Sequence, residues 1–421
     1  MRPYSSGWTA DLSLSKVWCV PKREQAPALQ RAVPSPTVDA MRATSGREVS
    51  NLSPCMENKT NINRLIEQIL ASKCEVVKLG VDVHARDLVV SIQLDGSLPQ
   101  RGRKMSREQL LALVRGLVEG ERRVYLLQEV GPCGYGLHRD LEKAGAVSYM
   151  MTPEALGDGR AQKTDNLDSC ALTDRLDRRV RGNTKAFSEV RVPTPEEEQQ
   201  RAQGRLRGQL KDSRQQWEAR GRSLLLAQGH HISGAWWKTK SWEQLRPTLV
   251  AWLVSELEIM RTIITTLDAQ ERARRAELEA AAPADLPKAV GALTWVLLVR
   301  EICDWQRFTN RRQVASYTGL CPGIYQSGRT RRDGSINRHG NPCVRHLLIE
   351  MVWRLVRWQP DYPPVRQLVA GVARGAARRK LAVAAARRLA IDLWRLATGQ
   401  TTAEKLKLIV PRELTVSLER A

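Results

Sequence analysis

Apolar and polar residues follow two different periods between residues 75 and 185. Short β-rich runs end at turn residues such as Asp95-Gly96 and Gly131-Pro132, and they occupy 76–83, 88–94, 124–130 and 147–151. Apolar residues at helical spacing of three and four fall between and after these runs, at 107–119, 136–144 and 164–179. Strands that alternate with helices predict an α/β domain over residues 75–185.

Pro193 and Pro195 interrupt the chain, and a long stretch without strand patterns follows them. Its clearest apolar seam steps by three or four residues through Leu249, Leu253, Leu257, Met260, Ile264 and Leu267. Residues 190–282 are therefore predicted to be a helical or coiled-coil segment that serves oligomerisation. The pattern fits an antiparallel helical hairpin, an oligomerising coiled coil or a plain pair of surface helices, and Gly204, Gly208 and Gly221 weaken the prediction in the first half.

Residues 283–400 are predicted to form a last, mainly helical domain. Asn341-Pro342 supplies an N-cap and a proline for a helix through about residue 358, and Gly399 ends a second helix over about 376–397. The stretch 317–340 is rich in Gly and Arg without apolar periodicity, so it is predicted to be a loop. Residues 401–421 are taken as a tail.

The first 74 residues are predicted to be a leader of uncertain structure. Residues 1–55 contain Pro, Ser, Thr and mixed charge, and helix-like spacing begins only after Met56. We therefore hypothesise that translation starts at Met56.

Charge narrows the class of partner. The chain has 67 Lys and Arg against 45 Asp and Glu, a net charge of +22, and a hydrophobic fraction of 42% that suffices for packed cores. Residues 301–400 hold 18 Lys and Arg against 6 Asp and Glu. Because cationic side chains release the counterions condensed on phosphates, this balance predicts a nucleic-acid partner.

Cysteine usage and hydropathy indicate a compartment. The eight cysteines are scattered without a C-x-x-C pair, which argues against zinc ribbons and disulfide frameworks and fits a reducing cytoplasm. No apolar run approaches the roughly 20 residues of a bilayer span, and the start lacks a signal-peptide pattern. We predict a cytoplasmic, nucleoid-associated protein without membrane contact.

Four acidic residues in the α/β domain stand where strands and a helix would bring them together. Asp82 interrupts an apolar strand, Glu129 ends another strand, and Asp165 and Asp168 lie three apart at the start of a helix. Converging carboxylates bind hard cations such as Mg²⁺, and two such ions can stabilise the attacking and leaving oxygens of a phosphoryl transfer. Asp165 and Asp168 also suit a helix N-cap and first turn, and Glu129 suits a surface strand end.

The motifs around these acids resemble the DEDD transposases of bacterial insertion sequences. The resemblance rests on Gly80-Val81-Asp82-Val83-His84, Gln128-Glu129-Val130-Gly131-Pro132 and Lys163-Thr164-Asp165-Asn166-Leu167-Asp168. These proteins form the insertion-sequence one-ten family of RNA-guided recombinases. The resemblance implies a RuvC-like, ribonuclease H-type catalytic domain whose four acids, Asp82, Glu129, Asp165 and Asp168, bind Mg²⁺.

The second half of the chain resembles the C-terminal transposase domain of the same family. The motifs are Tyr317-Thr318-Gly319-Leu320-Cys321-Pro322, Gln326-Ser327-Gly328, Gly334-Ser335-Ile336 and His339-Gly340-Asn341. The resemblance implies that Ser327 is the nucleophile, with Tyr325 and Ser335 as alternatives. One departure is Ala289, which lies in a turn where the family carries glycine, and alanine is costly there if φ is positive.

The resemblance also implies a reaction and its partners. With two Mg²⁺ ions on the acids, Ser327 would form a phosphoserine–DNA intermediate, and a DNA hydroxyl would then rejoin the strand. Donor and target DNA, a structured non-coding bridge RNA and a homo-oligomer, dimer or tetramer, are the implied partners. Candidate nucleic-acid-binding residues are Arg329, Arg331, Arg332, Arg338, Arg345, Arg378, Arg379, Arg387 and Arg388.

Two other hypotheses remain open on the sequence alone. The acids without Ser327 would support a Mg²⁺-dependent nuclease of the junction-resolvase type. A non-catalytic nucleic-acid-binding descendant of a transposase is the other hypothesis, and the intact acids count against it.

Overall fold

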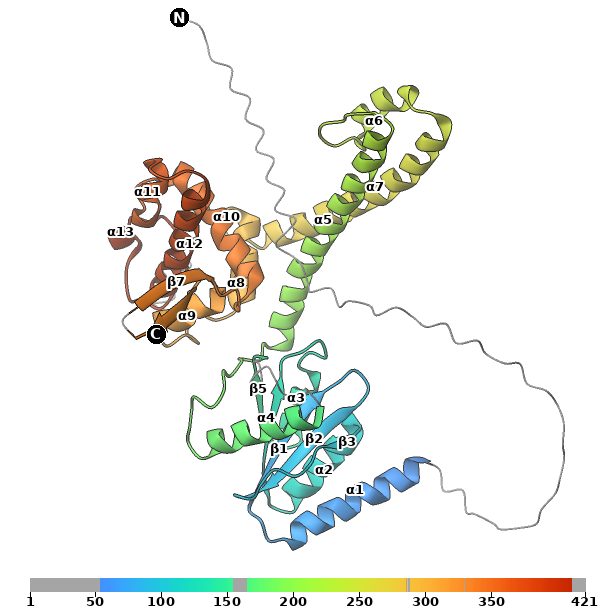
Figure 1. The fold of residues 1–421 in the computed structure, drawn as a ribbon, viewed down its shortest axis with the longest axis vertical. Coiled ribbons are helices and arrows are strands. Elements are labelled where there is room, and N and C mark those ends of the chain that lie inside the picture. The colour runs from blue at the N-terminus through green and yellow to red at the C-terminus, as the bar shows by residue number, and fades with distance from the viewer. Residues whose placement is uncertain (1–53, 154–164, 285, 287, 329, 411–421) are drawn as a thin grey trace, which may run out of the picture. The chain divides into compact units, whose positions relative to one another are not determined.

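The computed structural model describes residues 54–153, 165–284, 286, 288–328 and 330–410 (Figure 1). Contacts divide the chain into one unit of residues Met1–Glu67 and another of Gln68–Ala421. In the first unit the described residues belong to helix α1 (Pro54–Ala71), which continues into the second. The leader before residue 54 and the tail after 410 lie outside the described residues, and the predicted start at Met56 stays a prediction.

The α/β part is built on a five-stranded sheet in the order β3-β2-β1-β4-β5. The strands are β1 (Val76–Val83), β2 (Leu88–Leu94), β3 (Arg103–Met105), β4 (Arg123–Glu129) and β5 (Val147–Met151). Neighbours β1, β2 and β3 pair antiparallel, whereas β4 pairs parallel with β1 and with β5. The mixed α/β class and the predicted strands are confirmed to within one residue. Sequence reasoning missed β3, because three residues are too few to show a period.

Three helices cover this sheet. They are α2 (Arg107–Glu119), α3 (Gly136–Lys143) and α4 (Asp165–Val180). In Figure 1, α4 crosses in front of the sheet and packs on β1, β2 and β4, with α2 and α3 behind. Ser106 and Gln109 form a capping box that fixes the start of α2, where the apolar periodicity begins.

A helical hairpin follows within the same chain. Helices α5 (Pro195–Ala227) and α7 (Ala251–Ala280) lie side by side in Figure 1, joined through α6 (Thr239–Leu245) and a 3₁₀ turn, Arg246–Thr248. The seam residues Leu253, Leu257 and Ile264 are buried in a cluster with Trp236 and Trp242. Gly221 is needed there, because a β-carbon would lie 2.1 Å from the ring of Trp236. Of the three arrangements that the pattern allows, the antiparallel hairpin is the one observed, and oligomerisation stays a prediction.

The last part is mainly helical around one apolar core. Its elements are α8 (Ala292–Ile302), α9 (Arg311–Thr318), β6 (Pro322–Ser327), β7 (Thr330–Ile336), α10 (Pro342–Trp358), a 3₁₀ turn (Pro363–Val365), α11 (Arg366–Val369), α12 (Gly375–Ala397) and α13 (Ala403–Leu406). The core joins buried faces of α8, α10 and α12. Asn341 caps α10 by accepting hydrogen bonds from the backbone N–H groups of Cys343 and Val344, as its position predicts.

The predicted loop over 317–340 is wrong. It holds the end of α9 and a two-stranded antiparallel sheet, β6–β7, which turns at Gly328 with φ +54°. Most of the described side chains of this hairpin are exposed, so those described show no regular alternation of buried apolar and exposed polar residues. Backbone pairing and the turn, rather than burial, define it. None of the described helices is long and apolar enough to cross a membrane.

Candidate metal centre and nucleophile

The close approach of α4 to β1 places the first candidate site. Gly80 lies in β1 under α4, and a β-carbon at this position would stand 2.3 Å from the backbone oxygen of Ser169 and 2.4 Å from Oγ1 of Thr173. Thr173 in turn donates a hydrogen bond to the carbonyl of Ser169. Glycine is therefore required for the helix to lie directly on the strand that carries Asp82.

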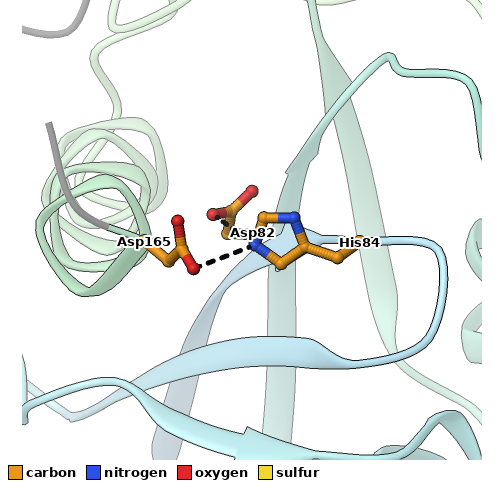
Figure 2. A group of neighbouring side chains, drawn as sticks. All are labelled: Asp82, His84 and Asp165. Atoms are coloured by element: carbon orange, nitrogen blue, oxygen red, sulfur yellow. Dashed lines mark ion pairs between the residues drawn. The ribbon is translucent and has the colours of Figure 1, made fainter. Parts of the chain in front are cut away.

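Asp82 and Asp165 meet at the end of β1, with His84 between them (Figure 2). Nε2 of His84 lies 3.2 Å from Oδ2 of Asp82 and 3.4 Å from Oδ2 of Asp165. The exposed fractions of the side chains are 25% for Asp82, 44% for His84 and 59% for Asp165. The group is therefore open to a substrate rather than sealed in the core.

Glu129 and Asp168 lie next to this group, Glu129 at the end of the neighbouring strand β4 and Asp168 on α4. Parallel pairing of Val81 with Gln128 puts Asp82 and Glu129 next in register, at neighbouring strand ends. Asp168 lies in the first turn of α4, one turn after Asp165. Both side chains are partly buried. The two strand ends and the helix start that carry the four acids therefore lie at the same end of the sheet.

Sequence reasoning missed His84 as a member of the site. The signal was available, because residues i and i+2 of an extended segment project to the same face and His84 follows Asp82 by two. Both contacts are made by one ring nitrogen, Nε2, so the imidazole lies between the two carboxylates as their shared partner.

The donor set fits a divalent cation. The ligand atoms of Asp82, His84 and Asp165 lie within 4.8 Å of one another. Two oxygens bound to one Mg²⁺ at about 2.0–2.1 Å are at most about 4.2 Å apart, so a small side-chain movement would close the set. Carboxylate oxygens suit Mg²⁺ or Mn²⁺, whereas imidazole nitrogen suits Zn²⁺ better.

Ser327 lies in the other sheet, at the end of β6. It pairs with Thr330 across the turn, and its side chain is exposed. Of the alternative nucleophiles, Tyr325 is 74% exposed on the same strand, and Ser335 is exposed on β7. The structure thus brings Asp82, Asp165 and His84 together and places the predicted serine on a separate, accessible hairpin.

The arginines predicted to bind nucleic acid divide into two groups. Arg332, Arg338, Arg378 and Arg379 are exposed, and Arg387 is partly exposed. Arg345 instead donates to the carbonyl of Thr318, and Arg388 pairs with the buried carboxylate of Asp392. These two have structural contacts; the i,i+4 spacing of Arg388 and Asp392 on a predicted helix was an available signal for the second, whereas the contact of Arg345 joins residues far apart in the chain. Arg329 lies outside the described residues, and nothing is described of the side chain of Arg331.

Ala289 does adopt the conformation that favours glycine, with φ +83°. Its side chain is almost fully buried, and Gln359 donates a hydrogen bond to the neighbouring carbonyl of Lys288. The condition on which the cost of alanine depends, a positive φ, is therefore met, and the cost itself stays a prediction.

Comparison with known proteins finds a family match in the last part of the chain and two relatives. Residues 287–365 match the Transposase IS116/IS110/IS902 family. "Putative transposase y4rJ" of Sinorhizobium fredii (strain NBRC 101917 / NGR234) is 34% identical over 265 residues, which cover 56% of this chain and 66% of that protein. "Putative transposase y4qE" of the same strain is 26% identical over 260 residues, covering 57% and 60%. The chain thus spans less than two thirds of the length of each relative. The matched region includes Ser327 and the hairpin, and over these residues the chain is similar to transposases of the IS116/IS110/IS902 family.

Proposed function

We propose that this protein is a transposase that cleaves and rejoins DNA strands, with metal-binding acids in the α/β part and a serine nucleophile in the last part. The observation that carries the proposal is the convergence of Asp82 and Asp165 at the strand end beside Glu129 and Asp168. The sheet order β3-β2-β1-β4-β5 supports a RuvC-like, ribonuclease H-type domain.

The carboxylates of Asp82, Glu129, Asp165 and Asp168 would hold Mg²⁺, which when bound supplies Lewis-acid polarisation of a phosphate. Because imidazole is a poor ligand for Mg²⁺, we assign His84 to orienting the two carboxylates that it contacts.

Ser327 performs the covalent step of the proposal. A bond forms between its Oγ and phosphorus, the bond from phosphorus to one bridging DNA oxygen breaks, and the serine proton leaves as the departing DNA oxygen gains one. A DNA hydroxyl then reverses the exchange and frees the serine. A serine needs nearby cations or a base for this role, and the exposed Arg332 lies on the paired strand.

Bridge RNA, donor and target DNA and a homo-oligomer complete the proposal. The net charge of +22 supports nucleic-acid partners. Sequencing the RNA that co-purifies with the protein tests whether the protein binds a structured non-coding RNA.

A covalent adduct tests the nucleophile. A nicked suicide substrate that lacks the rejoining hydroxyl is expected to trap a protein–DNA species that survives a denaturing gel. Ser327→Ala should abolish both adduct and cleavage, whereas Gln326→Ala on the same strand should keep both. If Ser327→Ala cuts DNA at the normal rate with Mg²⁺, water is the nucleophile, and the protein is a nuclease of the junction-resolvase type.

Metal removal tests the acids. Asp82→Ala and Asp165→Asn are expected to abolish cleavage and to lower Mg²⁺ affinity while the unfolding midpoint without metal stays near that of the wild type. EDTA should abolish cleavage by the wild type reversibly. Full cleavage activity in EDTA would show that the reaction needs no Mg²⁺ and would contradict the assignment of the acids as metal ligands.

A further inference from the structure

Tyr325 is a highly exposed aromatic side chain on the β6–β7 hairpin, and the proposed reaction gives it no role. Its exposed fraction is 74%. A ring left in water forgoes the free energy that its burial would contribute, so such a ring beside a proposed nucleophile requires an explanation. Within the hairpin the ring lies against Gly334, where an added β-carbon would stand 3.0 Å from it.

Register puts Tyr325 on the same face as Ser327. The two residues are separated by one on strand β6, so their side chains project to one side about 7 Å apart. Gln326 between them projects to the opposite side.

A cation lies on this same face. Arg332 on β7 pairs directly with Tyr325, and Thr330 pairs with Ser327. Directly paired residues of antiparallel strands share a face, with β-carbons about 4.5–5.5 Å apart. The face therefore presents an aromatic ring, a guanidinium and a hydroxyl in a strip no longer than a few residues, and all of these side chains are exposed.

This combination matches the chemistry of an unpaired nucleotide. Aromatic rings stack on bases whatever their identity, and a guanidinium binds phosphate oxygens through paired N–H donors. We propose that Tyr325 and Arg332 bind an unpaired nucleotide of the DNA strand next to the phosphate that Ser327 attacks, with the ring on the base and the guanidinium on a phosphate. The proposal rests on the proposed role of Ser327 and identifies the strand-binding site beside it.

The binding experiment uses the full chain carrying Ser327→Ala, in EDTA, so that no cleavage contributes. The probes are a fluorescein-labelled single-stranded DNA 30-mer of mixed sequence, the same DNA as a duplex, and the RNA of that sequence. Tyr325→Ala is expected to weaken single-stranded DNA binding about tenfold and Tyr325→Phe to preserve it, since the ring alone stacks. Duplex binding should change little.

The salt dependence of DNA binding distinguishes the role of Tyr325 from that of Arg332. Tyr325→Ala should leave the slope of log affinity against log salt unchanged, while Arg332→Gln should reduce it by about 0.7, the value for one single-strand phosphate contact. Gln326→Ala is the matched control from the opposite face and should change neither affinity nor slope.

Three outcomes would overturn the proposal. If Tyr325→Leu binds DNA as Tyr325→Phe does, the ring merely covers Gly334. If Tyr325→Ala binds as tightly as its parent chain, the face does not meet DNA. If the loss occurs with the RNA probe alone, the site belongs to an RNA. Each readout is independent of the adduct assay, so failure here and failure of Ser327 as nucleophile are distinguishable.

Discussion

Ala289 holds a backbone conformation that a residue with a β-carbon adopts only at a cost of about 1–2 kcal/mol. Burial of its methyl group offsets about 0.8 kcal/mol of this cost. The residues around Ala289 do not by themselves predict its φ. The family resemblance indicated a glycine at this position, and the structure gives the positive φ that a glycine would favour.

Ala289→Gly is therefore expected to raise the free energy of unfolding by up to about 1 kcal/mol, because relief of the positive φ exceeds the lost methyl burial. Denaturant unfolding followed by tryptophan fluorescence measures the change. Ala386→Gly, in the buried interior of α12, is the matched control and should lower the free energy by about 1 kcal/mol or more. Equal destabilisation by both variants would contradict the strain.

At the scale of elements, the fit between helix and strand decides which acids meet. The sequence predicted β1 and α4 from their periods, and it singled out Asp82, Glu129, Asp165 and Asp168 together from their positions. It did not reveal His84, because a single histidine after a strand is compatible with many roles. It did not reveal β6–β7 either, since an exposed hairpin lacks the burial that produces an alternating pattern.

Gly80→Ala tests the contact between β1 and α4. The added β-carbon would overlap the backbone of Ser169, so α4 must shift and carry Asp165 away from Asp82. We expect a loss of at least about 1–3 kcal/mol of stability, together with lower Mg²⁺ affinity by calorimetry. Gly131→Ala has open space around the new β-carbon and should keep the wild-type unfolding midpoint. If Gly80→Ala binds Mg²⁺ with unchanged affinity, the contact between α4 and β1 does not position the metal-binding acids.

Glu301 joins three elements through one buried carboxylate. It is 3% exposed in α8, receives two hydrogen bonds from Arg205 of α5, and receives another from Asn341, the N-cap of α10. Burial alone would raise the pKa of Glu301, but these hydrogen bonds hold it below its ordinary value of 4.5. A carboxyl group with a lowered pKa stabilises the fold above its unfolded pKa, and this stabilisation disappears as the pH falls through the folded value.

Glu301→Gln should thus cost about 1–3 kcal/mol at neutral pH, because Arg205 and Asn341 lose a charged acceptor. Below pH 4.5 the difference from the wild type should shrink, since the wild-type carboxyl is then protonated as well. Unfolding midpoints measured across this pH range test the sign. Glu277→Gln removes an exposed pair with Arg274 and should change little at any pH. A difference that grows toward acid would contradict the assigned direction.

At the scale of the whole molecule, the net charge of +22 is unevenly placed. The first half of α12 exposes Arg378, Arg379 and Lys380, and its first turn has no acidic residue. Arg378 lies over the ring of Trp353, 5.3 Å from its centroid, but cations near a helix N-terminus oppose the helix dipole, so helix stability does not account for the whole cluster. We expect the phosphate backbone of a nucleic acid to bind these cations.

Changing Arg378, Arg379 and Lys380 together to Glu is accordingly expected to reduce the slope of log affinity against log salt by about 2–3 for duplex DNA, since each phosphate that the helix no longer binds accounts for up to about 0.9. The fold should remain, because negative charge suits this end of the helix. The matched control makes the same change in net charge on α7, at Arg272, Arg274 and Arg275, which already pair with acids. Filter binding at several salt concentrations compares the two variants. If net charge alone governed binding, both would flatten the slope equally; a local surface on α12 requires that only the first does.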